Sequence, residues 1–183
     1  KHEWLKAGNI YAELATIYED DKTYDQLTRD AAMRVKLEAT YKEDGQWKDD
    51  LEEIKIDVVP EVSLQIYNYY VENPDFAKMV SRALNNLAMM REIPKLSEVF
   101  KPLGEPEKCD QFEQQIKNLE KQATTQSQNK KFATREFWQA FLKLLVINDE
   151  TCQLPRNVII KEFLDASLAE LDPFTNVIWP AEL

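Results

Sequence analysis

Side chains that commonly carry catalysis are sparse in this sequence. The single histidine is His2, so neither a Ser-His-Asp or Cys-His catalytic set nor a histidine-based zinc site can be assembled. A serine nucleophile would therefore need a lysine as its base. None of the serines lies in the G-x-S-x-G context of a nucleophile elbow; they are Ser63, Ser81, Ser97, Ser127 and Ser167. The sequence predicts no catalytic residue, no metal ligand and no cofactor.

The two cysteines are Cys109 and Cys152, which lie 43 residues apart and form no C-x-x-C redox or zinc motif. Both fall among apolar residues with helical spacing, which favours buried positions. In an exported protein they could form one disulfide, whereas in a reducing compartment they would remain two buried thiols. The sequence leaves both interpretations open.

The densest group of carboxylates lies in the first third of the chain and consists of Glu43, Asp44, Asp49, Asp50, Glu52 and Glu53. A calcium loop needs acidic ligands at alternate positions, a central glycine and a closing glutamate. Only Asp44-Gly45 has that character, and Gln46-Trp47-Lys48 stand where further ligands should be. We interpret the group as the solvated start of a helix, where negative charge favours the positive end of the helix dipole.

Composition excludes several classes of function. The chain has 33 Asp and Glu against 23 Lys and Arg, a net charge of −10 and a pI near 4.7. This balance argues against nucleic-acid binding, which depends on clustered Lys and Arg. Only 3 glycines exclude a Gly-rich phosphate loop and allow few turns with positive φ. The composition therefore favours helices.

Length and apolar content predict one folded domain. A chain of 183 residues, 44% of them hydrophobic, can bury a substantial core. No run approaches the ~18 consecutive apolar residues of a membrane span. Apolar residues at steps of three and four predict about seven or eight helices. We expect them over 2–19, 23–41, 48–59, 60–70, 74–91, 109–123, 134–147 and 155–171.

Some boundaries follow from particular residues. Thr23 with Gln26 has the form of a capping box. The stretch 48–59 is ambiguous, because its last part alternates as a strand would. We expect an irregular all-α domain over 1–171, with a polar linker at 124–131 and a short extended tail over 172–183.

Tyr67, Tyr69 and Tyr70 form a cluster of aromatic residues. Tyrosine is enriched at interfaces, so the cluster could be a recognition surface. Aromatic residues at helical spacing more often belong to the core, and we expect that here.

Trp4, Gly8 and Tyr11 resemble the opening of a tetratricopeptide repeat, whose helix pairs recur about every 34 residues. The later small and aromatic positions match only loosely, and no second copy follows. This resemblance implies a freestanding helical module for protein–protein interaction.

The C-terminal segment carries a more specific resemblance. From residue 168 it reads Leu-Ala-Glu-Leu-Asp-Pro-Phe-Thr, and it resembles the junction of carboxyl-terminal processing (tail-specific) proteases. In that family a helix ends in Leu-Asp-Pro-His-Ser/Thr, followed by an aromatic residue, an aliphatic residue and Pro-Glu. Phe174 stands in place of the usual histidine, and Val177 in place of the aromatic. The matching residues are Leu171, Asp172, Pro173, Thr175, Ile178, Pro180 and Glu182.

A second segment, residues 18–27, is similar to the aromatic-acidic turn in the helical hairpin of the same family. The resemblance implies an N-terminal helical region that precedes a PDZ domain and a serine protease core with a Ser-Lys dyad. Both domains would follow Leu183, so no catalytic residue is carried over to this chain. Family members usually work outside the cytoplasm, which implies a periplasmic or secreted location, although these residues include no signal peptide.

We therefore expect a non-catalytic, mechanical role. The domain would pack against its own downstream PDZ and protease domains, self-associate, or dock an adaptor or substrate protein. Ile178, Trp179 and Leu183 are expected to form an exposed apolar strip, because tryptophan near a chain end usually requires cover.

Overall fold

The computed structural model describes residues 3–129, 132–172 and 174–182. Within these ranges the chain is all-helical and has no strand, which confirms the predicted all-α fold. His2 lies outside the described residues, and no helix within them is long and apolar enough to cross a membrane. The α-helices are α1 (Trp4–Ile17), α2 (Lys22–Thr40), α3 (Trp47–Asp50), α4 (Val58–Tyr69), α5 (Phe76–Met89), α6 (Leu96–Val99), α7 (Pro106–Asn129), α8 (Thr134–Glu150) and α9 (Arg156–Leu168).

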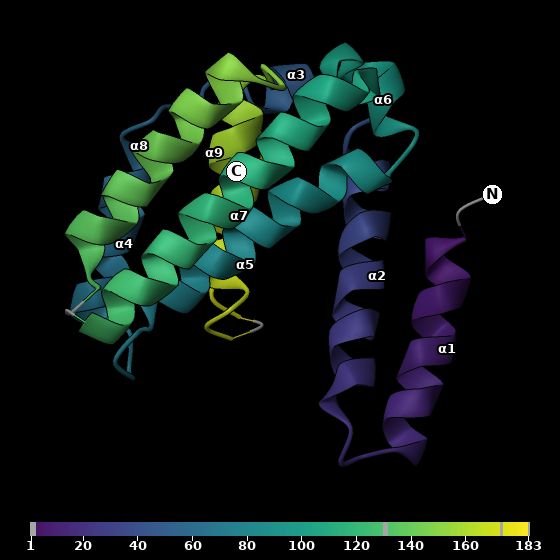
Figure 1. The fold of residues 1–183 in the computed structure, drawn as a ribbon, viewed down its shortest axis with the longest axis horizontal. Helices are drawn as coiled ribbons and strands as arrows, with labels where there is room; N and C mark the ends of the chain where they lie inside the picture. The colour runs from purple at the N-terminus through teal and green to yellow at the C-terminus, as the bar shows by residue number, and fades with distance from the viewer. Residues whose placement is uncertain (1–2, 130–131, 173, 183) are drawn as a thin grey trace.

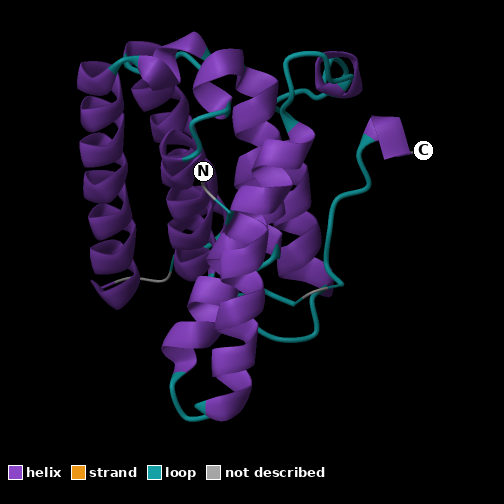
Figure 2. Ribbon diagram, turned by 90° about the vertical axis from the view of Figure 1, so that its right-hand side faces the viewer, coloured by secondary structure: helices purple, strands orange, loops and turns teal. Residues whose placement is uncertain are grey.

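The molecule has two parts, which Figure 1 distinguishes. Helices α4, α5, α7, α8 and α9 pack together as a body, with α5 in contact with both α7 and α9. Helices α1 and α2 form an antiparallel hairpin whose free end extends beyond the body, as Figures 1 and 2 both show. Because α1 packs mainly against α2, the second half of α2 joins the hairpin to the body.

Side-chain caps set the starts of two helices. The Asp21 carboxylate accepts a hydrogen bond from the backbone N–H of Thr23 (3.0 Å), so α2 starts at Lys22 and its cap is Asp21, not the predicted Thr23. Asp75 accepts from the N–H groups of Ala77 and Lys78, both at 3.1 Å, at the start of α5. Each carboxylate satisfies N–H groups that have no partner within the helix and favours the positive end of its dipole.

The core of the body is built around phenylalanine rings from α5, α8 and α9. The Phe137 ring lies between those of Phe76 and Phe163, with centroid distances of 5.5 and 5.1 Å. Phe141, one turn further along α8, lies 5.0 Å from Phe163. Each such contact contributes about 0.5–1.5 kcal/mol beyond area burial, so these rings hold the three helices in register.

A second aromatic cluster closes the base of the hairpin. The rings of Tyr41, Trp47 and Phe100 lie 5.3–5.5 Å apart, and Trp47 donates to the backbone oxygen of Lys42 at 2.9 Å. Trp47 opens α3, a single turn, and the next helix starts only at Val58. The predicted continuous helix over 48–59 is therefore wrong: residues 51–57 form turns and irregular backbone, in which Leu51 and Ile54 are buried.

The predicted polar linker at 124–131 is also not observed as such. Residues 124–129 continue α7, and the last two positions lie outside the described residues. Thr124 donates its hydroxyl to the backbone oxygen of Glu120 at 3.0 Å, which keeps this polar end of the helix in regular geometry. Polar composition here reflects a solvent-exposed helix face.

The two sides of α8 offer a direct test of this packing. Leu144 is fully buried, whereas Leu142, two residues earlier, is 39% exposed. We expect Leu144→Ala to lower the free energy of unfolding by about 2–5 kcal/mol, because it leaves a cavity in the core. The matched control Leu142→Ala should cost less than about 1 kcal/mol. Urea denaturation measures both, and equal losses would contradict the orientation of α8.

Candidate functional site

Helix α1 displays apolar side chains that the described chain does not cover. Leu5, Ile10 and Ile17 are 66%, 56% and 68% exposed, and no residue of α1 is buried. Between Trp4 and Ile17 the only charged residues are Lys6 and Glu13, so the helix has no net charge within a chain of −10. We call this set of side chains, Leu5, Ile10 and Ile17, the arm surface. Scattered exposed apolar residues are common, but a helix with none buried is unusual.

The inner side of α1 packs closely on α2. A Cβ on Gly8 would lie 3.3 Å from the Cβ of Ala31, so glycine permits the close approach of the two helices. The Trp4 ring lies beneath the Arg34 guanidinium at 4.9 Å, and the rings of Tyr18 and Tyr24 lie 5.6 Å apart near the hairpin's free end. Trp4 and Gly8, two residues of the repeat-like opening, thus lie on the side of α1 that packs against its antiparallel neighbour α2.

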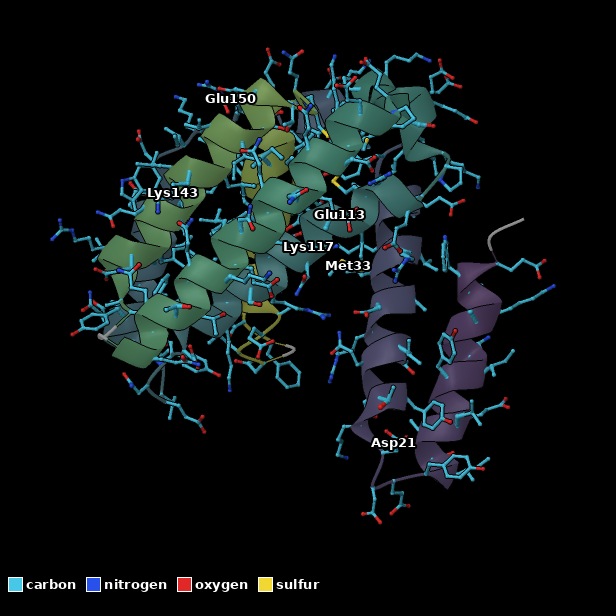
Figure 3. The ribbon with its side chains drawn as sticks, viewed as in Figure 1. Asp21, Met33, Glu113, Lys117, Lys143 and Glu150 are labelled. Carbon is cyan, nitrogen blue, oxygen red and sulfur yellow. The ribbon has the colours of Figure 1, made fainter. Side chains whose placement is uncertain are left out.

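Charged pairs connect α2 to the body. Arg34 pairs with Glu92 and Lys95 with Glu38, while Arg82 of α5 lies 3.3 Å from Asp30. Figure 3 shows Asp21 at the far end of the hairpin and Met33 where α2 approaches the body. Because charge pairing requires a defined geometry at both partners, these contacts orient the hairpin.

Asp165 of α9 is the central member of this polar base. Its carboxylate accepts from Lys36 of α2 (2.9 Å), from Lys161 (2.6 Å) and from the indole N–H of Trp179 (2.9 Å). Burial opposes ionisation of the carboxyl group, but the charges and hydrogen bonds of Lys161 and Lys36 keep its pKa below the usual range. Asp165 thereby links the hairpin, α9 and the C-terminal segment at one point.

Glu162, one turn before Asp165, is 1% exposed. It accepts from the Tyr41 hydroxyl (2.6 Å) and from the Asn86 side-chain amide (3.1 Å). Burial raises the pKa of the Glu162 carboxyl, and burial together with the negative charge of Glu162 raises the pKa of Tyr41 well above its usual value. This second carboxylate joins the hairpin base to α5 and α9.

A cleft of about 740 Å³ lies between α2, α9 and the C-terminal segment. Arg29, Lys36 and Arg82 line it together with Asp165 and Glu182. Because acidic side chains line the cleft beside the basic ones, it presents no excess of positive charge to an anion. The cleft lies where the hairpin joins the body.

The junction motif forms a compact turn. Asp172 accepts from the backbone N–H groups of Phe174 (2.7 Å) and Thr175 (2.9 Å) and from the Thr175 hydroxyl (2.5 Å), and the bond to that hydroxyl lowers the pKa of Asp172. Leu171 packs on the core, while Pro180 and Glu182 form part of a short 3-10 helix. Pro173 lies outside the described residues.

The expected exposed apolar strip at the C-terminal end is wrong for Trp179. Its side chain is 3% exposed and contacts α9 through Asp165 and Lys161, and its backbone N–H donates to Glu182 at 3.0 Å. Ile178 is exposed as expected, and Leu183 lies outside the described residues. The chain itself therefore supplies the cover that the tryptophan requires.

The structure separates the remaining candidates from one another. Tyr67 and Tyr69 are exposed, and only Tyr70 packs partly on the core, so the expectation of a buried tyrosine cluster is wrong for the first two.

No group of carboxylates, histidines or cysteines in the described ranges converges as a metal site. The acidic residues around Asp44 thus form no cation loop there. Cys109 and Cys152 are both buried and are present as thiols.

Sequence reasoning missed the two carboxylates of α9. Glu162 and Asp165 occur on a helix whose neighbouring residues are almost all buried. An acidic residue inside an apolar helix is the signal that could have identified them, because such a group needs a partner. Their partners, Tyr41 and Lys36, lie more than a hundred residues earlier in the chain.

Comparison of the chain with family models, with curated proteins and with solved structures finds no match.

The buried position of Glu162 predicts a specific pH dependence. Its folded-state pKa is raised, so the folded protein holds this proton to higher pH than the unfolded chain does, and stability falls as pH rises from about 4.3 through the folded pKa. Glu162→Gln removes this loss of stability. The Asn86 side-chain oxygen, which has no hydrogen-bond partner among the described residues, can accept from the new amide. The stability of Glu162→Gln relative to the wild type should rise across that window. Urea denaturation between pH 4 and 9 measures the difference, and a pH-independent difference would contradict the assignment.

Asp165 predicts the opposite behaviour. Its lowered folded pKa stabilises the folded state above the unfolded value of about 3.9, and this stabilisation is lost as pH falls through the folded pKa. Asp165→Asn should cost about 2–4 kcal/mol at pH 7, because it leaves the largely buried Lys161 without its counter-charge. The cost should shrink at pH 3. Asp149→Asn, which breaks the exposed pair with Arg156, is the control and should cost less than about 1 kcal/mol.

Proposed function

We propose that this chain is a non-catalytic helical docking domain that binds a protein through the arm surface of its α1–α2 hairpin. The observation that carries the proposal is the combination of an extended hairpin with exposed aliphatic side chains on its outer helix. Exposed apolar groups on an ordered helix are typical of surfaces that bind another protein.

The energetics suit a moderately strong contact. Full burial of an aliphatic side chain stabilises a complex by about 1.5–3 kcal/mol, so Leu5, Ile10 and Ile17 together could supply several kcal/mol. Charge does not oppose such a contact, because α1 is neutral although the whole chain is acidic. The charged base of the hairpin holds the arm in a fixed direction, which reduces the ordering cost of binding.

The resemblance of the C-terminal segment to the protease junction suggests where this domain would lie in a longer protein. In that context the domain precedes the PDZ and protease domains of an extracytoplasmic protein resembling carboxyl-terminal processing proteases. The arm would then contact those domains, a second copy of the chain, or an adaptor or substrate protein. A freestanding interaction module, as the Trp4-Gly8-Tyr11 pattern implies, is the alternative, and it uses the same arm.

A photo-crosslinking amino acid placed at Ile10 of the full-length native protein tests the proposal. We expect crosslinks from Ile10 to a defined protein surface, and their masses distinguish the protein's own downstream domains, a second copy and a separate partner. Lys143 on α8, which Figure 3 shows on the far side of the body from the hairpin, is the control position. Equal crosslinking from both positions would sink the proposal.

A paired substitution tests the chemistry of the same surface. Ile10→Gln with Ile17→Gln places a good helix former at both positions and removes apolar area, so the affinity for the partner identified by crosslinking should fall at least about tenfold. Leu64→Gln with Val146→Gln, which changes exposed aliphatic residues on α4 and α8, should leave binding unchanged. Thermal unfolding should be alike for both pairs, so that a loss of binding is not a loss of fold.

A further inference from the structure

The topology of α7 and α8 places the two cysteines at the same end of a helical hairpin. α7 and α8 are consecutive, contact each other and run antiparallel in Figure 1. Cys109 lies 20 residues before the last residue of α7, and Cys152 lies 18 residues after the first residue of α8. At 1.5 Å per residue these positions are about 30 and 27 Å from the connection. Although the two cysteines are distant in sequence, they therefore lie at nearly the same height along the α7–α8 hairpin.

The side chains complete this juxtaposition. The Cys109 and Cys152 side chains lie close enough that each thiol affects the pKa of the other. They are 2% and 0% exposed and belong to the same buried cluster. The Cys109 thiol also donates to the backbone oxygen of Leu103 at 3.2 Å, which holds it in place at the start of α7.

The surroundings argue against a nucleophilic or metal-binding role for this pair. Burial raises the pKa of Cys109, and burial with the neighbouring Cys109 sulfur raises the pKa of Cys152 to about 12. Attack on a substrate and metal binding both require thiolates, which this site disfavours. Two adjacent buried sulfur atoms are instead suited to a structural bond.

We propose that Cys109 and Cys152 become joined by a disulfide bond when the chain folds in the presence of a disulfide oxidant, such as oxidised glutathione. One cysteine thiolate attacks the oxidant's disulfide, forming a mixed disulfide and releasing one glutathione. The second cysteine then attacks the mixed disulfide, forms the Cys109–Cys152 bond and releases the second glutathione. Two electrons pass to the oxidant, and the two cysteine protons end on the released thiols.

The bond would close the α7–α8 hairpin at its open end. Cys152 lies in the turn between α8 and α9, so the bond would also fix the entry to α9, the helix that carries Glu162 and Asp165. A disulfide that closes a loop of this length restricts the unfolded chain more than the folded one. The inference is independent of the docking role, because the site lies in the body and not on the arm.

Refolding of the reduced full chain in a glutathione redox buffer tests the proposal. We expect a mass loss of about 2 Da, no free thiol after denaturation, and one peptide pair joining Cys109 to Cys152 in an unreduced digest. The oxidised protein should unfold about 5–15 °C higher than the reduced protein. Protein that has already folded in its reduced form should react at least about tenfold more slowly, because both thiols are buried and protonated.

Cys109→Ala and Cys152→Ala are matched controls, and in each the oxidant should give no rise in unfolding temperature. If either variant fails to fold, the mass and peptide map of the wild type still decide the question. Two free thiols after oxidative refolding would overturn the proposal. Glutathione adducts or intermolecular dimers in place of the internal bond would overturn it equally.

Discussion

Two carboxylates on α9, those of Glu162 and Asp165, make the hydrogen bonds on which the arrangement of the other elements depends. Glu162 reaches Tyr41 at the hairpin base and Asn86 of α5, and Asp165 reaches Lys36 of α2 and Trp179 of the C-terminal segment. A buried carboxylate without partners is strongly unfavourable, so these groups must all be in place together. Apolar packing tolerates small changes of shape, whereas these hydrogen bonds define a single register between the hairpin, the body and the tail.

The rest of the molecule consists of a body and hairpin base that are packed around these carboxylates, and an outer helix that extends beyond them. Within the body, phenylalanine rings from three helices supply apolar burial and an aromatic cluster closes the base of the hairpin. Beyond the base, α1 relies on close packing against α2 and leaves aliphatic side chains in solvent. A rigid base with an uncovered arm is an arrangement suited to docking, because the arm is already oriented before a partner arrives.

Sequence patterns predicted regular helices well and irregular segments poorly. The apolar stripes predicted over 74–91 and 155–171 matched α5 and α9, because helical periodicity is a local signal. The helix predicted over 48–59 is not continuous, because apolar residues in irregular backbone can be buried against a core without any helical or strand periodicity. The linker predicted from residue 124 is helical up to residue 129, because a polar run is equally typical of an exposed helix and of a linker. Trp179 was expected at the surface because its partner Asp165 cannot be identified from sequence spacing.

By itself the sequence determined an acidic, all-α chain without a histidine-based catalytic set, because composition and local periodicity govern helix formation and the available chemistry. It also identified Cys109 and Cys152 as a candidate pair without deciding whether they meet. Only the tertiary structure decided which side chains meet and which remain exposed. It brought the two thiols together, buried Glu162 and left α1 uncovered. Those outcomes depend on packing between segments far apart in the chain, and no local pattern encodes such contacts.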